Sequence, residues 1–543
     1  MRAIDLYSGI GGWSAGLRCA GVDVVEAYEI WPAAVATYNA NLGTDHVASD
    51  VRRLDFGLLP NDIDLVVGSP PCTEFSYSNR GGGGNLLEGL KDVVRFLEVV
   101  EHVQPRYWLM ENVPRTASVI EQGLKTKGHP LYRFRSLQPQ IKVLNFAEFG
   151  LPQSRSRCLV GIFPFDTLES YRSNAVNRDL GGVIRCLSEG RVARDPIWGF
   201  ELDRSLLTEM EPEAELNLEQ LRMNREAKRF HPVYNDMAFP DSLDQPSRTV
   251  TATCTRVSRE SIVVSDGRQG SVRRLTVRER ASLQGFPITY QFYGKSHSQK
   301  VKMVGNAVPP FLSYLIGAAA QHREMVEASE LPLAAKRLPI PSLPPPVTPP
   351  HAVGVSYPVK RQFRAALPSL RFKSGMRFQL SNNCDGDDVR WSVEFFFGPS
   401  KDIKTVVLDG ALLERLMRQP ALATALARTS GQLDQVRRFT TSRSPANLQE
   451  AWRQSVSGAG PYQLVDALGQ AAVALSCEIS DVPTDLVVKL VLACCASSEG
   501  ILRSKDKLAL NAVAVMAGFL LGSWFNEITW GSEMPIQLKR KTA

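Results

Sequence analysis

The sequence lacks the cysteine spacings that hold disulfide-bonded domains or structural zinc sites together. Its nine cysteines are an odd number and include no CxxC pair, which argues against both kinds of cross-link. We therefore expect a reducing compartment, the cytoplasm, and no bound metal. A strand predicted at Met1–Tyr7 begins with the first residue, so that no signal peptide is expected ahead of it.

The sequence also lacks an uninterrupted apolar run that would cross a membrane. Leu508–Phe525 approaches the required length, but Asn511, Ser523 and two glycines interrupt it, and we interpret it as a buried core helix. The hydrophobic content of 44% and the charged content of 22% are ordinary for a soluble globular protein. A net charge of +7 is compatible with a polyanionic partner but does not require one.

The amino-terminal segment has the order strand, glycine turn and helix, which is typical of a nucleotide-binding unit. The strand Met1–Tyr7 breaks into Ser8–Gly12 (SGIGG), and a helix is expected from there through Ala20. Glycines let the backbone approach a ligand closely, and the first turn of the helix offers free amide donors. A lone glycine turn is a weak signal, so the residues after the next strands decide its meaning.

Two acidic residues follow this unit at the ends of predicted strands. Glu29 comes after a strand at Val22–Tyr28, and Asp50 ends a strand at His46–Asp50. An acid about twenty residues after the glycine turn is where such units place a ribose-binding carboxylate. Each residue could instead cap a helix or lie in a solvated turn.

Cys72 is the candidate nucleophile of the chain. A short apolar strand at Asp64–Gly68 ends in a Gly-Ser-Pro-Pro break, and Cys72 follows Pro70 and Pro71 directly. In an open α/β sheet, ligands bind at the carboxyl ends of the strands, so that a thiol there can act on a substrate. The glycine-rich tract Ser78–Asn85 suits a flap rather than a packed core. The alternative is an inert, buried cysteine.

Three further residues point to the same chemistry. Glu111 ends a strand at Tyr107–Met110 and should lie beside Cys72, where a carboxyl can protonate or hydrogen-bond the ring under attack. Arg155 and Arg157 stand at alternate positions of an extended segment, so that both would point the same way and grip a base oxygen and a phosphate. The alternative for the arginines is a solvated basic strand.

Several separated motifs stand in order along this part of the chain: Pro70-Pro71-Cys72, Glu111-Asn112-Val113, Gln153–Arg157 (QSRSR), Arg274–Pro287 (RLTVRERASLQGFP) and Val304–Pro310 (VGNAVPP). Together they resemble the C5-cytosine DNA methyltransferase family over about residues 1–325. The resemblance implies methyl transfer from S-adenosylmethionine to C5 of cytosine in duplex DNA, through a covalent cysteine adduct and base flipping. It also implies a restriction-modification or defence context.

The resemblance implies roles for individual residues as well. Glu29 would bind the ribose hydroxyls of S-adenosylmethionine and Asp50 its adenine amine. The implied cofactor contacts are Tyr7, Ser8, Gly9, Gly11, Gly12, Glu29, Ile30, Asp50, Val51, Pro70, Asn306 and Val308. The implied catalytic residues are Cys72, Glu111, Arg155 and Arg157, and no metal ligand is implied. One departure is Thr73, where the family usually has glutamine.

The expected fold class is α/β: a Rossmann-like, S-adenosylmethionine-dependent methyltransferase domain with an inserted target-recognition domain, followed by a C-terminal α+β accessory domain. Residues 1–164 and 271–328 should form the catalytic domain, and 165–270 the target-recognition domain. Prolines crowd residues 329–350, which predicts a semi-rigid linker. Residues 351–543 should form the accessory domain.

The accessory domain resembles no family and shows no catalytic constellation. Its stretch 360–377 carries six basic residues and no acid, with Phe363, Phe372 and Phe378 interleaved. This pattern predicts added nonspecific DNA affinity, and docking of a protein partner is the second hypothesis. The alternative is an ordinary solvated face whose phenylalanines are core.

Three other functions fit part of these observations. A tRNA cytosine-5 methyltransferase would share the motifs, although the insertion at 165–270 and the accessory domain favour DNA. A catalytically weak DNA-binding subunit of a larger complex would fit the departure at Thr73. A nicotinamide-dependent oxidoreductase would use the glycine turn and Glu29, but it leaves Cys72 and Glu111 unexplained.

Overall fold

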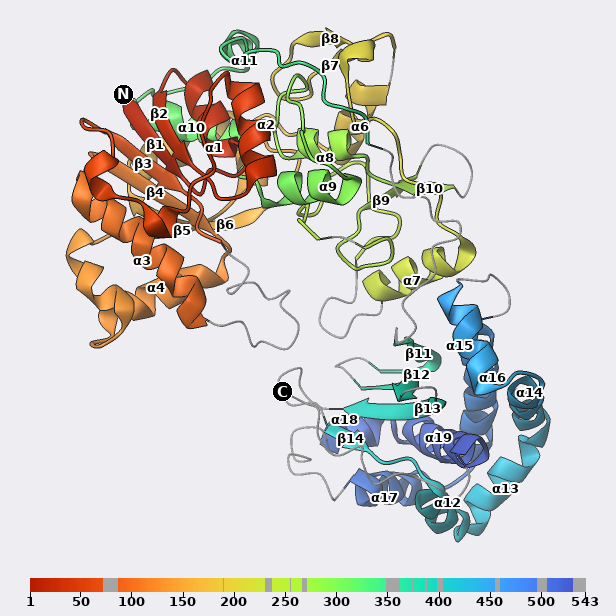
Figure 1. The fold of residues 1–543 in the computed structure, drawn as a ribbon. Helices are drawn as coiled ribbons and strands as arrows, with labels where there is room; N and C mark the ends of the chain where they lie inside the picture. Colours follow the sequence, from red (N-terminus) through yellow and green to blue (C-terminus); the bar gives the residue numbers. More distant parts are fainter. Residues whose placement is uncertain are drawn as a thin grey trace. The chain divides into compact units, whose positions relative to one another are not determined.

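The protein, a computed structural model shown in Figure 1, divides into two compact units. The first unit comprises Met1–Glu215 and Phe239–Pro350, and the second comprises Leu216–Ala238 and His351–Thr542. The structure describes residues 1–71, 86–188, 190–229, 237–253, 255–265, 271–347, 362–372, 376–385, 388–397, 404–454, 460–495 and 505–530.

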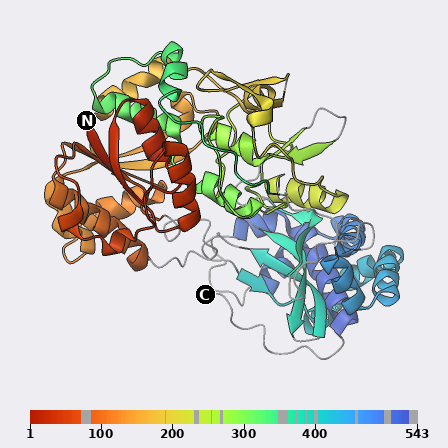
Figure 2. The ribbon, with the colours of Figure 1, turned by 45° about the horizontal axis from the view of Figure 1, so that its top comes forward.

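A six-stranded sheet lies at the centre of the first unit (Figure 2). Its strand order is β2-β1-β3-β4-β6-β5. β2, β1, β3 and β4 run parallel, whereas β6 is antiparallel to both β4 and β5. This mixed sheet agrees with the expected α/β class. The strands are β1 (Arg2–Leu6), β2 (Asp23–Tyr28), β3 (Leu65–Gly68), β4 (Tyr107–Asn112), β5 (Gln140–Asn145) and β6 (Ser156–Ile162).

Two hydrophobic cores cover the two faces of this sheet. Ala3 and Leu109 belong to one core, whereas Ile4, Trp108 and Met110 belong to the other, because successive side chains of a strand point to opposite faces. The sheet is therefore the middle of three layers. The first core holds α1 (Gly12–Cys19), α2 (Pro32–Leu42) and α10 (Pro310–Ala320), and the second holds α3 (Leu86–Val103) and α4 (Arg115–Lys125).

One predicted strand is absent. Within His46–Asp50, the Ser49 N–H donates to Glu29 O at 2.8 Å, but Glu29 lies beyond the end of β2, and no ladder of hydrogen bonds forms. Asp50 instead caps the 3-10 turn η1 (Val51–Arg53), where its Oδ1 accepts the Arg52 N–H at 3.0 Å. The prediction of a strand ending in Asp50 is wrong for this reason.

The chain between β6 and α10 forms short elements. All residues of α10 are buried, and this helix packs with α1 in the first core, so that the late motifs return to the first glycine turn. The elements are α5 (Phe165–Ser170), α6 (Leu180–Ser188), β7 (Val192–Arg194), β8 (Glu201–Asp203), β9 (Val263–Ser265), β10 (Val272–Arg274), α8 (Val277–Leu283) and α9 (His297–Asn306).

The predicted linker at 329–350 is not extended from its start. Its first part forms α11 (Leu331–Ala335), and Leu331, Ala334, Ala335 and Leu338 are buried in the first core. These four positions have the spacing of one helix face, which precedes the proline-rich part of the segment. The prediction from proline content therefore put the start of the linker too early, because residues up to Leu338 still pack in the first core.

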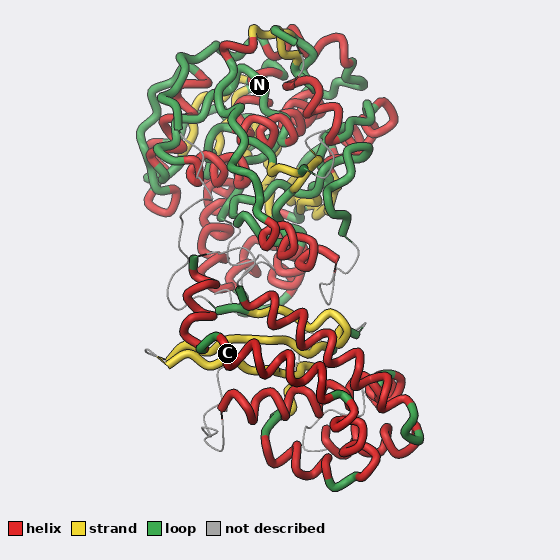
Figure 3. The backbone as a smooth tube through the Cα atoms, turned by 90° about the vertical axis from the view of Figure 1, so that its right-hand side faces the viewer, coloured by secondary structure: helices red, strands yellow, loops and turns green. Residues whose placement is uncertain are grey.

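The second unit has a four-stranded antiparallel sheet, in the order β11-β12-β13-β14, packed with helices (Figure 3, strands yellow and helices red). One hydrophobic core joins the sheet to the helices. The strands are β11 (Arg364–Arg371), β12 (Arg377–Asp385), β13 (Asp388–Phe397) and β14 (Lys404–Val406). The helices are α12 (Gly410–Met417), α13 (Pro420–Arg428), α14 (Ser430–Ser442), α15 (Pro445–Arg453), α16 (Pro461–Ser480), α17 (Thr484–Cys495), α18 (Lys505–Leu510) and α19 (Ala512–Trp530).

The basic stretch 360–377 contributes to this core. Phe363 and Phe378 are fully buried, and Phe372 packs against the same cluster. Arg371 forms an ion pair with Glu226 at 3.0 Å. The aromatic side chains are therefore core, as the alternative interpretation expected, and they do not serve as a stacking surface for bases.

Helix α7 (Leu218–Arg229) falls inside the predicted target-recognition domain but belongs to the second unit. The guanidinium of Arg222 donates two hydrogen bonds to Asp466 on α16, at 2.7 and 2.8 Å, and lies 4.6 Å from the centre of the Tyr462 ring. Met223 packs against the second unit's core. A chain cut near Ala328 would therefore lose the residues against which α7 packs.

Two helical stretches, His297–Ala320 and Ala512–Thr529, are long and apolar enough to cross a membrane. Both are mostly buried inside the fold. In the second of them, Phe519 and Phe525 are fully buried in the core of the second unit. This burial agrees with the core helix predicted at Leu508–Phe525.

We expect Arg222→Ala to lower the free energy of unfolding of the second unit by about 1 kcal/mol, because it removes a partly exposed ion pair and a cation–π contact. Arg225→Ala is the matched control, since Arg225 is exposed on the same helix. Denaturant titrations of the full chain, followed by tryptophan fluorescence, measure both variants. Equal midpoints for the two variants would contradict this packing of α7.

Candidate active site

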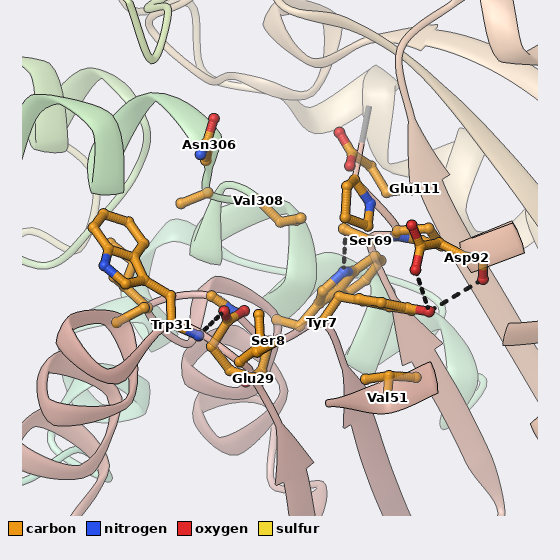
Figure 4. A pocket seen from close by; sticks show the side chains of 18 of the residues that line it. Tyr7, Ser8, Glu29, Trp31, Val51, Ser69, Asp92, Glu111, Asn306 and Val308 are labelled. Atoms are coloured by element: carbon orange, nitrogen blue, oxygen red, sulfur yellow. Dashed lines mark hydrogen bonds between the residues drawn. The ribbon is translucent and has the colours of Figure 1, made fainter. Parts of the chain in front are cut away.

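A cavity of about 410 Å³ opens at the carboxyl ends of the parallel strands of the first unit (Figure 4). This is the edge at which open α/β sheets bind ligands. Residues from the ends of β1, β2, β3 and β4 contribute to its wall, together with the connection between α9 and α10. Of the predicted cofactor contacts, those that line the cavity are Tyr7, Ser8, Gly9, Glu29, Ile30, Asp50, Val51, Pro70, Asn306 and Val308.

The glycine turn divides into a part that faces the cavity and a part that does not. Gly9 has a positive φ of 56°, and a Cβ added there would meet nothing within 4 Å, so that its backbone borders open space. Gly11 and Gly12 do not line the cavity. A Cβ on Gly12 would come within 2.1 Å of Val308 O, so this glycine permits the close approach of the α9–α10 connection. Gly11 and Gly12 were predicted to contact the cofactor, but in the structure Gly11 lies against Tyr38 and Leu42, and Gly12 lies against Val308.

Glu29 is held by the backbone around it. Its Oε2 accepts the Gly9 N–H at 2.9 Å, and its Oε1 accepts the Trp31 N–H at 2.7 Å. Burial raises the pKa of Glu29, and these two hydrogen bonds act in the opposite direction. Each carboxylate oxygen can accept more than one hydrogen bond. The carboxylate is thus fixed in the wall while it keeps acceptor capacity for ligand hydroxyls.

A charged network that the sequence did not reveal lies beside Asp50. Arg52 donates to Asp92 through Nε and Nη2, both at 2.7 Å, and to Glu88 through Nη1 at 2.6 Å. The Tyr7 hydroxyl donates to Asp92 at 3.2 Å, and burial with the neighbouring charge of Asp92 raises the pKa of Tyr7 far above its usual range. Arg52 and Asp92 line the cavity. Glu88 and Asp92 stand four residues apart on α3, and this spacing was the available signal in the sequence.

Glu111 is the last residue but one of β4 and is 6% exposed in the cavity wall. Arg157, on the antiparallel neighbour β6, approaches it with Nε 2.9 Å from Glu111 Oε1. The guanidinium therefore fixes the direction of this carboxylate. The expected position of Glu111 at a strand end is confirmed, whereas its pairing with Arg157 follows from the β4–β6 contact and was not predicted.

Arg155 is only 2% exposed and does not line the cavity. Its guanidinium donates to the carbonyl oxygens of Val250 (3.2 Å), Gly305 (3.3 Å) and Ala307 (3.2 Å). Because β6 begins at Ser156, Arg155 lies outside the strand, and the alternation rule does not align it with Arg157. These contacts indicate a supporting role rather than the predicted grip on the substrate.

Cys72, Thr73 and the tract 78–85 lie outside the described residues. The chain just before them is held firmly: Asn112 Nδ2 donates to Pro70 O at 3.0 Å, and Trp13 Nε1 donates to Ser69 Oγ at 2.9 Å. Pro70 and Pro71 line the cavity next to Glu111 in the wall. Among the described residues, no group of three His, Cys, Asp or Glu could hold a metal ion.

Asp5 lies beneath the glycine turn and is completely buried. Its Oδ2 accepts the Ser14 hydroxyl at 2.6 Å, and Ser14 in turn accepts the Tyr38 hydroxyl at 2.9 Å. Burial raises the pKa of Asp5 to about 7. The apolar strand around Asp5 gave no signal for this network.

Comparisons with known proteins agree on the first part of the chain. A family model described as C-5 cytosine-specific DNA methylase matches residues 1–322. The Type II methyltransferase M1.HphI of Haemophilus parahaemolyticus is 31% identical over 350 residues, covering 58% of this chain and 85% of the relative. The Type II methyltransferase M.FnuDI of Fusobacterium nucleatum is 27% identical over 335 residues, covering 58% and 93%. The solved structure of the S. pombe Dnmt2 methyltransferase has 23% sequence identity and a TM-score of 0.38, covering 59% and 98%.

We expect the free energy of unfolding to fall more steeply between about pH 4 and pH 7 in the wild type than in Asp5→Asn. The folded state keeps the Asp5 proton up to about pH 7, whereas the unfolded chain releases it near the ordinary pKa of 3.8. The stability that protonated Asp5 contributes is therefore lost as the pH rises through this range. Denaturant titrations across this range measure the slopes. Asp23→Asn, an exposed carboxyl on β2, is the control, and identical slopes for Asp5→Asn and the wild type would refute the raised pKa.

Proposed function

The chain belongs to the C-5 cytosine-specific DNA methylase family and is a DNA cytosine-5 methyltransferase; we propose that its methyl donor is S-adenosylmethionine and its nucleophile Cys72. The observation that carries this proposal is the cavity at the strand ends. Its wall contains the fixed carboxylate Glu29, the two prolines before Cys72, and Glu111. This lining supports a donor site and a nucleophilic site within one cavity.

The residues in the wall fit S-adenosylmethionine. Glu29 offers acceptors for the two ribose hydroxyls, and Asp50 lies at the same wall for a donor group on the adenine. Gly9 leaves space where a side chain would intrude. Asn306 and Val308 approach from the opposite side of the cavity, as Figure 4 shows. When bound, S-adenosylmethionine supplies an electrophilic methyl group.

The chain's own residues make cytosine reactive. C5 of cytosine is a poor nucleophile until a thiolate adds to C6, and we assign this addition to Cys72. Glu111 holds a proton at N3 of the ring while negative charge develops there. C5 then has the character of an enamine carbon and can attack the methyl group that the bound donor would supply, whose sulfonium sulfur is the leaving group. Loss of the C5 proton and elimination of the thiolate from this C5-methylated adduct then restore the aromatic ring.

Arg157 contacts the proposed catalytic residue Glu111, whereas Arg155 contacts only the backbone around the site in the hydrogen bonds described above. Arg157 holds the Glu111 carboxylate at 2.9 Å, which sets the direction in which its other oxygen can meet the ring. Arg155 donates to the carbonyl oxygens of Val250, Gly305 and Ala307. Because Ala307 lines the cavity, we assign Arg155 a positioning role. The target base must leave the DNA stack to reach a concave site of this kind, which supports base flipping in duplex DNA.

The relatives named Type II methyltransferases support a place in a restriction-modification system. The family model describes a DNA methylase, so a tRNA substrate is not favoured. We propose that residues 165–215 and 239–270 recognise the DNA target, without α7, which packs in the second unit. The proposed location is the cytoplasm, and docking of a protein partner remains a proposed role of the second unit.

The experiment that tests the function uses a DNA duplex containing 5-fluorocytosine. Fluorine cannot leave C5 as a cation, so the wild type should form an adduct with the duplex that survives denaturing electrophoresis, in the presence of S-adenosylmethionine. Cys72→Ser should form no adduct and transfer no methyl group, yet bind the cofactor normally. Cys477→Ser is the control, because Cys477 is an exposed free cysteine. Near-normal turnover by Cys72→Ser would exclude the covalent mechanism.

Glu29→Ala should weaken S-adenosylmethionine binding by about 1–3 kcal/mol, because ribose hydroxyls would lose a charged acceptor. Asp50→Ala should also weaken binding, with Asp45→Ala as a control on an exposed carboxyl nearby. Isothermal calorimetry with S-adenosylmethionine and with NAD measures these effects. Wild-type affinity in both variants would exclude the proposed contacts, and tighter binding of NAD would favour an oxidoreductase.

A further inference from the structure

A second cavity, of about 390 Å³, lies within the second unit and takes no part in the methyl-transfer site. Its volume falls in the range of about 300–1,000 Å³ that is typical of pockets for small ligands. Its wall comes from β13, from the end of α14 and the start of α15, and from α16 and α19, elements that Figure 1 labels.

One part of the wall is aromatic and rigid. Trp391 and Phe525 are buried among core residues of the second unit and form apolar lining. The Trp391 Nε1–H donates to Pro445 O at 3.1 Å, which fixes the indole at the start of α15. Phe439 is partly buried at the end of α14. A planar ring placed here would contact aromatic side chains, two of which the core of the second unit already holds in place.

The other part of the wall is cationic. Arg390 and Arg443 both line the cavity, and the guanidinium of Arg443 lies 5.2 Å from the centre of the Phe439 ring. None of the described lining residues is Asp or Glu. Arginine is the side chain best suited to a phosphate, because its planar fork donates two parallel hydrogen bonds. The cavity therefore favours an anion next to a planar ring.

Hydroxyl groups complete the lining. The Oγ1 atoms of Thr440 and Thr441, at the end of α14, donate their hydrogens to the carbonyl oxygens of Val436 and Arg437, at 3.3 and 2.7 Å. A hydroxyl that donates in this way still accepts hydrogen bonds. The amino or imino groups of a base would find acceptors here.

We propose that this cavity binds a nucleotide, with its phosphate at Arg390 and Arg443 and its base against Trp391 and Phe439. The nucleotide could be free or part of a DNA strand, since both present the same ring and phosphate. Arg438 is exposed on α14, five residues before Arg443, and could contact a neighbouring phosphate of a strand. The second unit would thus bring its own nucleotide site to a DNA-modifying enzyme.

The test uses the full chain saturated with S-adenosylmethionine, so that the first cavity is occupied. Isothermal calorimetry compares thymidine 5′-monophosphate, thymidine, inorganic phosphate and the trinucleotide d(TTT), none of which contains a cytosine that could enter the active site. Arg390→Gln and Arg443→Gln are tested separately, so that one misfolded variant does not decide the outcome. Arg418→Gln, an exposed arginine of the same unit outside the cavity, is the control.

We expect the nucleotide to bind more tightly than thymidine or phosphate alone, and each cavity variant to bind it about tenfold more weakly, the effect of losing a charge-assisted hydrogen bond. Tighter binding of d(TTT) than of the mononucleotide would identify a DNA strand as the source, and the reverse order a free nucleotide. The proposal is overturned if phosphate alone binds as tightly as the nucleotide, if no nucleotide binds, or if both cavity variants match Arg418→Gln.

Discussion

In the parallel pairing of the first unit's sheet, Leu6 lies opposite Tyr28 on one side and Gly68 on the other, and Gly68 lies opposite Met110. β1, β2 and β3 therefore end in one row, and β4 continues past this row to Asn112, so that all four strands have their carboxyl ends on the same side of the sheet. A slip of one residue in any pair would turn buried side chains to the wrong core. The burial of the two cores thus fixes the site, because the residues a short way beyond this row are Gly9, Glu29, Pro70 and Glu111.

The connection between α9 and α10 closes one side of the cavity at these strand ends, because Asn306, Ala307 and Val308 line it. Val308 O sits where a side chain on Gly12 would be, and Arg155 bonds the carbonyls of Gly305 and Ala307 on the other side of this connection. The backbone of Val308 thus lies directly against Gly12, although the two residues are about three hundred positions apart in the sequence. Backbone carbonyls bonded by a buried guanidinium form a wall that side-chain motion disturbs little.

Residues at the carboxyl ends of the parallel strands were predictable from the sequence, because a parallel sheet brings such positions together. This holds for Glu29, which directly follows β2, and for Glu111, the last residue but one of β4. Contacts between distant segments were not predictable. No local feature separates an arginine that grips a base from Arg155, whose guanidinium bonds three carbonyls of the chain itself. Likewise, phenylalanines among arginines fit both a core and a stacking surface, and only the burial of Phe363 decides between them.

The capture of α7 by the second unit also sets an order of events during synthesis. Arg222 and its partner Asp466 are 244 residues apart, and a ribosome adding about 5–20 residues per second needs roughly 12–50 s to cover that distance. During this interval the insertion between Glu215 and Phe239 has emerged, but the surface that receives it does not exist. The nascent enzyme therefore passes through a stage in which all strands of the six-stranded sheet have been synthesised, whereas the residues against which helix α7 packs have not.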